Sequence, residues 1–134
     1  MNNFRFSFVS LKNMEGVHPD LIKVAELALS LSPVDFGISH LSVRTMAQQY
    51  ALLSEGKSHT TKSKHVPENN PSGLSCAIDV IAYDNRHISW EPGLYRVIGQ
   101  AFVYASAELG TPITLGCLFH SFFDGPHVEL RDSR

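Results

Sequence analysis

The 134-residue sequence has little cysteine: only Cys76 and Cys117, too far apart for the Cys-x-x-Cys spacing of a thiolate metal site. Both lie in apolar runs, so we expect buried free thiols rather than a disulfide. A chain without a disulfide framework depends on its own hydrophobic core, and this length with 43% apolar residues is sufficient for one. The sequence therefore predicts a single globular domain over residues 1–134.

Three further features are missing. No apolar run reaches the roughly 18 residues of a membrane span, and residues 1–6 lack the charged-then-apolar order of a secretory signal. A formal net charge of −2 argues against a nucleic-acid partner, because such proteins usually carry a basic excess. We therefore expect a monomer made in a cytoplasm without a signal peptide, with no membrane insertion, whose work outside the cell would need a separate exit route.

Apolar periodicity indicates the secondary structure. Helical spacing predicts helices at roughly 20–31, 45–55 and 93–109. Short apolar stretches predict strands at 36–43, 74–83, 112–118 and 126–130, with an edge strand at 3–9. The second helix is expected to bury Met46, Tyr50 and Leu53. This order predicts an α+β fold in which a small, mainly antiparallel sheet packs with about three helices.

A long polar loop separates the second helix from the strand that begins near Leu74. Residues 57–73 are dominated by Lys, Ser, Thr, His, Asn and Pro. Long loops in compact domains are usually functional or mobile. We expect this one to form a mobile rim outside the core.

One acidic residue and two histidines are the candidate ligands of a metal ion. Asp79 interrupts an apolar strand, so it must lie near the surface, be hydrogen-bonded or bind a cation. Taken singly, His65 and His127 are explained equally well as solvated or structural histidines. Together the three form a two-histidine, one-carboxylate set that suits a catalytic zinc ion with one open position. Asp124, three residues before His127 across a Gly-Pro turn, would then be placed to accept a proton from water.

These motifs occur in an order that resembles a known family. Ser-x-His at 63–65, Ala-x-Asp at 77–79 and Asp-x-x-His-x-Glu-Leu at 124–130 are similar to those of the zinc peptidases of family M15, in particular the L-alanyl-D-glutamate peptidase branch of phage endolysins. The resemblance covers nearly the whole chain and implies the fold shared by hedgehog proteins and D-Ala-D-Ala carboxypeptidases.

The resemblance also implies roles for individual residues. It makes His65, Asp79 and His127 the ligands of one Zn²⁺ per chain and Asp124 the general base. Arg44 matches an arginine that faces the substrate carboxylate or the developing oxyanion, which its planar fork suits. The resemblance also implies that Ser63 supports the same pocket as Arg44.

Three departures from the family pattern affect the surroundings of the site. The spacing between His65 and Asp79 is longer than usual, and residues 66–73 look inserted. Ser75 stands where the family has a glycine, and residues 115–120 lack an expected Asp-Trp pair. Because all three ligands persist, we expect an altered pocket wall rather than loss of the metal.

The resemblance thus implies a zinc metallopeptidase that cuts the peptide stem of peptidoglycan muropeptides and acts at the cell wall after release. A D-Ala-D-Ala carboxypeptidase of the same fold is the alternative enzyme. A non-catalytic wall-binding or phage structural module is the alternative from another class, although the intact ligand set argues against it.

Overall fold

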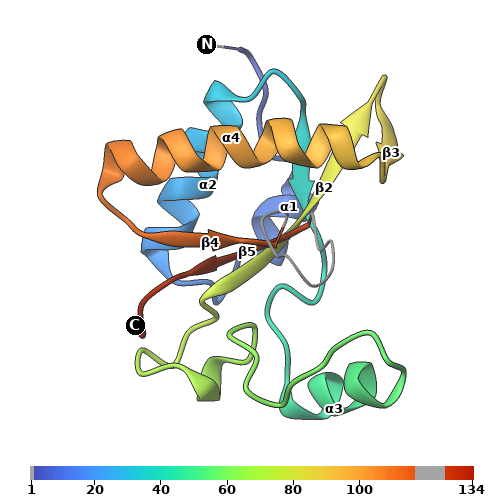
Figure 1. The fold of residues 1–134 in the computed structure, drawn as a ribbon, viewed down its shortest axis with the longest axis vertical. Helices are drawn as coiled ribbons and strands as arrows, with labels where there is room; N and C mark the ends of the chain where they lie inside the picture. Colours follow the sequence, from blue (N-terminus) through green and yellow to red (C-terminus); the bar gives the residue numbers. More distant parts are fainter. Residues whose placement is uncertain (1, 117–125) are drawn as a thin grey trace.

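The computed structural model describes residues 2–116 and 126–134. Figure 1 shows the arrangement of its elements, which follow in the order α1 (Phe8–Asn13), α2 (Pro19–Leu31), β1 (Phe36–Ile38), α3 (Met46–Ser54), the 3-10 helix η1 (Pro67–Asn69), β2 (Ala77–Asp84), β3 (His87–Ser89), α4 (Pro92–Leu109), β4 (Ile113–Leu115) and β5 (His127–Leu130). The predicted α+β class is confirmed. No helix in the described part of the chain is long and apolar enough to cross a membrane.

Strand β2 is the centre of the sheet. The strand order is β1-β2-β5-β4, with β3 also paired to β2, and every one of these pairings is antiparallel. Ala82 pairs with both Phe36 of β1 and Ser89 of β3, so β3 lies on the edge of β2 opposite β1. Strand β5 pairs with the same edge of β2 as β3 does, but along residues 77–79 of β2, where Asp79 lies opposite His127.

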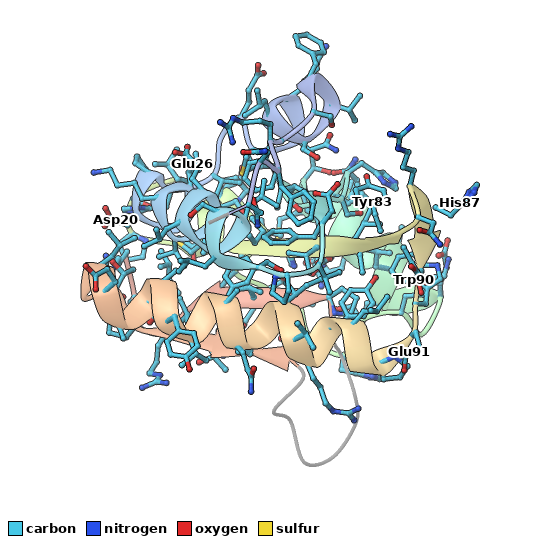
Figure 2. The ribbon with its side chains drawn as sticks, turned by 90° about the horizontal axis from the view of Figure 1, so that it is seen from above. Asp20, Glu26, Tyr83, His87, Trp90 and Glu91 are labelled. Carbon is cyan, nitrogen blue, oxygen red and sulfur yellow. The ribbon has the colours of Figure 1, made fainter. Side chains whose placement is uncertain are left out.

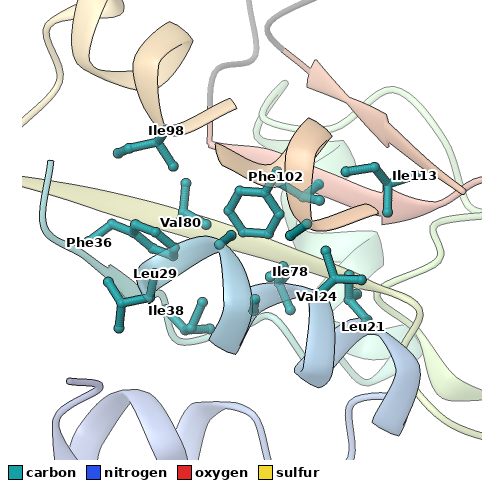
Figure 3. Packing of buried hydrophobic residues seen from close by; sticks show 14 of the residues in the cluster. Leu21, Val24, Leu29, Phe36, Ile38, Ile78, Val80, Ile98, Phe102 and Ile113 are labelled. Carbon is teal, nitrogen blue, oxygen red and sulfur yellow. The ribbon is translucent and has the colours of Figure 1, made fainter. Parts of the chain in front are cut away.

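The two faces of β2 differ in character. Ile78, Val80 and Ala82 are buried, whereas Asp79 between them is partly exposed on the other face. The buried face packs against α2 and α4, which contact each other (Figure 3). Since side chains alternate along a strand, a single hydrophobic face leaves the opposite face available for polar residues.

Local capping explains the bounds of the main helices. Pro19 occupies the first turn of α2, where its missing N–H costs nothing. The Glu91 side chain accepts the hydrogen bond that starts α4, and Gly110 ends that helix with a left-handed φ of 64°. Both predicted helices are therefore confirmed, and Leu109, the last residue of α4, is 42% exposed.

Two of the predicted strands, both in the N-terminal half of the chain, differ in the structure. The edge strand at 3–9 is wrong: helix α1 begins at Phe8, because the Ser7 side chain accepts a hydrogen bond from the Ser10 N–H. The strand at 36–43 ends at Ile38. Leu41, inside the predicted range, has a φ of 65°, which a strand does not tolerate.

Helix α3 forms as predicted but buries a different residue. Its start is a capping box between Thr45 and Gln48. Of the three residues expected in the core, Tyr50 is 55% exposed and Met46 and Leu53 are half-buried, whereas Gln49 is fully buried. Gln49 is buried because its side chain forms hydrogen bonds with Arg44, before the helix, and with Ser58 and Thr60, after it.

The hairpin of β2 and β3 was not predicted. Its turn places Asn85 and Arg86 at φ values of 49° and 68°, the positive range that two-residue hairpins need. Figure 2 shows Trp90 just beyond β3, close to the start of α4. The Trp90 ring stacks parallel to Tyr95 at 6.1 Å between ring centroids. A strand of three residues is too short to give a clear alternation in sequence.

The polar loop at 57–73 is only partly what was expected. Its second half is anchored: Val66 is fully buried, and Asn70 Nδ2 contacts the carbonyls of Lys64, Val66 and Leu74. The expectation that the whole loop lies outside the core is therefore wrong for this half. The residues that look inserted fold back on the segment that carries His65.

We expect Asn70→Asp to lower the free energy of unfolding by about 3 kcal/mol, because two amide hydrogen bonds are lost and a carboxylate faces carbonyl oxygens. Asn85→Asp, on the exposed hairpin turn, is the matched control and should change stability by less than about 0.5 kcal/mol. Urea denaturation of both variants measures this. Equal stabilities would mean that the Asn70 hydrogen bonds do not stabilise the fold.

Candidate metal centre

The structure brings His65, Asp79 and His127 together. Asp79 and His127 are cross-strand neighbours on the same face of β2 and β5, whereas His65 reaches them from the loop after α3. His65 Nε2 lies 3.2 Å from His127 Nδ1 and 3.3 Å from Asp79 Oδ1, and the last two atoms are 3.4 Å apart. One ligand atom from each residue lies within 4.8 Å of the other two, so this group could hold a metal ion.

The buried His65 ring is oriented by a backbone carbonyl. His65 is 2% exposed, and its Nδ1 lies 3.0 Å from the carbonyl oxygen of Ser42. A carbonyl only accepts, so Nδ1 carries the proton and Nε2 of the neutral ring presents its lone pair to the other two ligands. The Ser42 hydroxyl in turn accepts from the Asp79 N–H at 3.1 Å. One fully buried serine thus positions two of the three residues.

A carboxylate orients the second ring in the same way. His127 Nε2 lies 2.8 Å from Glu129 Oε1, so this nitrogen donates and Nδ1 faces Asp79 and His65. Lys64 Nζ lies 3.3 Å from Glu129 Oε2 and also donates to the carbonyl oxygen of Arg131. Metal-binding histidines typically donate their far N–H to a carboxylate or a backbone carbonyl, and both rings here do so.

Asp79 divides its two oxygens between different partners. Oδ1 faces the histidines, and Oδ2 accepts from the Arg44 guanidinium at 3.0 Å. Burial raises the pKa of Asp79, but electrostatic interactions and hydrogen bonds with His65 and His127 outweigh it and hold that pKa far below its ordinary value. The carboxylate is therefore ionised at any physiological pH.

His127 is the group whose protonation opposes metal binding. Burial lowers its pKa, but hydrogen bonds and charges from Asp79 and Glu129 outweigh this and raise the pKa to about 9. In the metal-free protein His127 Nδ1 lies 3.2 Å from His65 Nε2. A proton on His127 Nδ1 prevents the repulsion that two facing lone pairs would cause at this distance. A metal ion must displace that proton, so its affinity should rise with pH.

The other predicted site residues have different outcomes. Arg44 lies beside His65, Asp79 and His127, and its guanidinium donates hydrogen bonds to Asp79, Leu41 and Gln49. Ser63 is buried, and its hydroxyl accepts a hydrogen bond from the His65 N–H at 3.2 Å. Ser63 therefore supports the loop that carries His65. Asp124 lies outside the described residues.

Sequence reasoning did not find three supporting residues, Ser42, Gln49 and Lys64. The His-x-Glu spacing of β5 could have revealed that Glu129 orients His127, because residues two apart share a strand face. It could also have pointed to Lys64 as the cation that pairs with Glu129. No local pattern marks Ser42 or Gln49, whose partners lie far along the chain.

Comparisons with known proteins agree with the motif order. The sequence model of the family described as "Phage L-alanyl-D-glutamate peptidase" matches residues 2–131. The L-alanyl-D-glutamate peptidase of Escherichia phage T5 is 34% identical over 143 residues, covering 96% of this chain and 98% of that protein. The crystal structure of the Serratia marcescens L-Ala D-Glu endopeptidase ChiX matches with a TM-score of 0.82 and 34% identity, covering 96% of this chain and 91% of that one.

The metal-free protein should become less stable between pH 6.5 and about 9. Because folding raises the pKa of His127, the stabilisation is complete below the unfolded pKa of 6.5 and is lost as pH passes the folded pKa of about 9. The loss amounts to at most about 3 kcal/mol. Denaturation curves with a chelator, for the wild type and His127→Gln, measure it. Parallel curves for the two proteins across this range would contradict the assignment.

Proposed function

We propose that this chain, which belongs to the phage L-alanyl-D-glutamate peptidase family, is a zinc-dependent endopeptidase that cuts the L-Ala–D-Glu bond in the peptide stems of bacterial peptidoglycan. The observation that carries the proposal is the convergence of His65, Asp79 and His127 in a chain of this family. Its substrate would be peptidoglycan muropeptides, and its place of action the cell wall.

The donor set favours zinc over other biological cations. Two imidazole nitrogens and one carboxylate oxygen suit zinc, whereas calcium and magnesium prefer sites made only of oxygen. A tetrahedral ion with bonds of about 2.0–2.1 Å holds its ligand atoms about 3.3–3.4 Å apart. The three separations of 3.2, 3.3 and 3.4 Å between the ligand atoms are close to that value. Three protein ligands leave a fourth position open, as in catalytic sites.

When bound, zinc would polarise the scissile carbonyl and make water more acidic. The chain's own residues would then handle the protons. We assign Asp124 as the general base that takes a proton from the attacking water and returns it to the leaving amine. Glu129, the other candidate base, is bonded to His127 and Lys64, and its pKa is lowered by them against the effect of burial. This leaves Glu129 better suited to orienting His127 than to accepting a proton.

Arg44 and Ser63 would act on the substrate side. The Arg44 side chain is 12% exposed, and its guanidinium lies 3.0 Å from Asp79 Oδ2. A planar guanidinium in that place would stabilise a substrate carboxylate or the developing oxyanion. Ser63 would support the same pocket through the His65 loop. Both assignments are part of the proposal.

Two alternatives compete with this function. A D-Ala-D-Ala carboxypeptidase would use the same ligand set, but the named relatives are L-Ala–D-Glu peptidases. A non-catalytic wall-binding module would not need ligand histidines whose far nitrogens are both paired, as they are here with Ser42 and Glu129.

Digestion of purified peptidoglycan tests the bond and the metal together. We expect new amino-terminal D-Glu residues by mass spectrometry, loss of activity with a chelator, and recovery on adding about one equivalent of zinc. His65→Ala is the metal-site control and should neither bind zinc nor cleave. Release of free D-Ala instead would identify a carboxypeptidase, and zinc-independent cleavage would exclude the proposed centre.

Asp124→Asn should reduce turnover by about 10²–10⁴-fold, because the amide keeps the shape but cannot accept the proton. Zinc content and melting temperature should remain at the wild-type values. The matched control is Asp132→Asn, an exposed aspartate in the same C-terminal region. Near-normal cleavage by the Asp124 variant would assign the base to another group.

A further inference from the structure

We infer that Gln49, on helix α3, is a positioning residue for the metal centre: it holds Arg44 so that the guanidinium fixes Asp79 with one oxygen toward the two histidines. This inference rests on the proposed zinc centre. It assigns a function to the fully buried glutamine in a helix that otherwise lies apart from the core. Figure 1 shows α3 on the opposite side of the sheet from α2 and α4.

The chain of contacts begins at the metal ligand. Asp79 Oδ2 accepts from Arg44 at 3.0 Å, and this leaves Oδ1 as the oxygen that faces His65 and His127. The backbone N–H of Arg44 also donates to the carbonyl oxygen of His65 at 3.0 Å. Arg44 therefore contacts two of the three ligand residues.

The guanidinium is held at two further points. Its Nε donates to the carbonyl oxygen of Leu41 at 2.8 Å, and an Nη donates to Gln49 Oε1 at 3.0 Å. Because the guanidinium is planar, hydrogen bonds on several of its edges define both its plane and its rotation. Removing the bond to Gln49 would free the group to turn about the bond to Leu41 and so change how it meets Asp79.

Gln49 is itself anchored from the far side. Its Nε2 donates to Ser58 Oγ and to the carbonyl oxygen of Thr60, each at 2.7 Å. The side chain thus joins Arg44 to the polar loop that leads to His65. A buried amide whose oxygen and nitrogen are both paired has one orientation, and this rigidity is what a positioning residue requires.

The test compares two adjacent glutamines of the same helix. Gln49→Met removes the contacts with Arg44 and the loop, whereas Gln48→Met removes only the exposed capping bond to the Thr45 N–H. We expect zinc affinity, measured by competition with a chromophoric chelator, to fall about 10-fold in the Gln49 variant and to stay within about twofold in the Gln48 variant. The visible spectrum of the cobalt(II) protein should change only in the Gln49 variant, because it reports the ligand geometry.

A double-mutant cycle distinguishes positioning from loss of packing. If Gln49 acts through Arg44, then adding Gln49→Met to Arg44→Met should change zinc affinity by less than about twofold further. Additive losses, or an unchanged affinity and cobalt spectrum in Gln49→Met, would overturn the inference. Should that variant not fold, Gln49→Asn, too short to join Arg44 and Thr60, is expected to show the same weakening, and wild-type affinity in it would also overturn the inference.

Wild-type zinc binding is measured first and keeps the two proposals separate. A wild-type protein that binds no zinc would overturn the metal centre and this inference together. A wild-type protein that binds zinc, alongside a Gln49→Met variant that binds it equally well, would overturn this inference alone.

Discussion

The negative charge of Asp79 is the constraint on which the site depends. It lies on a strand whose neighbouring residues, Ile78 and Val80, are fully buried, and an unpaired carboxylate there would cost several kcal/mol. The fold meets this cost with a cation at each oxygen: His127, beside the neutral His65 ring, at Oδ1 and Arg44 at Oδ2. The two histidines that make the carboxylate tolerable are also the residues that, with Asp79, could hold a metal ion, so the proposed function would share its contacts with the stability of the fold.

The backbone between β1 and α3 does much of this positioning without regular secondary structure. Leu41 adopts a left-handed conformation, which costs a bulky residue about 1–3 kcal/mol. That turn directs the carbonyl groups of Leu41 and Ser42 toward Arg44 and His65. Strain of this kind persists only where surrounding contacts hold it, and the buried Ser42 supplies them through Asp79 and Ser75. The turn therefore helps to shape the candidate metal centre.

The long spacing between His65 and Asp79 does not displace either residue from the group that could hold a metal ion. Asp79 is positioned by its register with His127 in the sheet. His65 is positioned by Ser42 and by a loop that Asn70 closes onto the carbonyl of Lys64. Ser75 donates its hydroxyl hydrogen bond to the carbonyls of Ser42 or Ala77. Because the two residues are held independently, the extra residues between them fold back on the His65 segment and the geometry of the group is kept.

The sequence by itself determined the helices α2 and α4, the α+β class and the three residues that could hold a metal ion, because apolar periodicity and side-chain chemistry are local properties. It also carried the motif order that identifies the family. It did not determine the start of α1, the β2–β3 hairpin or the burial of Gln49 in place of Tyr50. Those depend on contacts between distant residues: only the folded chain brings Gln49 to Arg44 and Ser42 to Asp79. A buried polar side chain is stable only with its partners, and the local sequence of α3 does not reveal them.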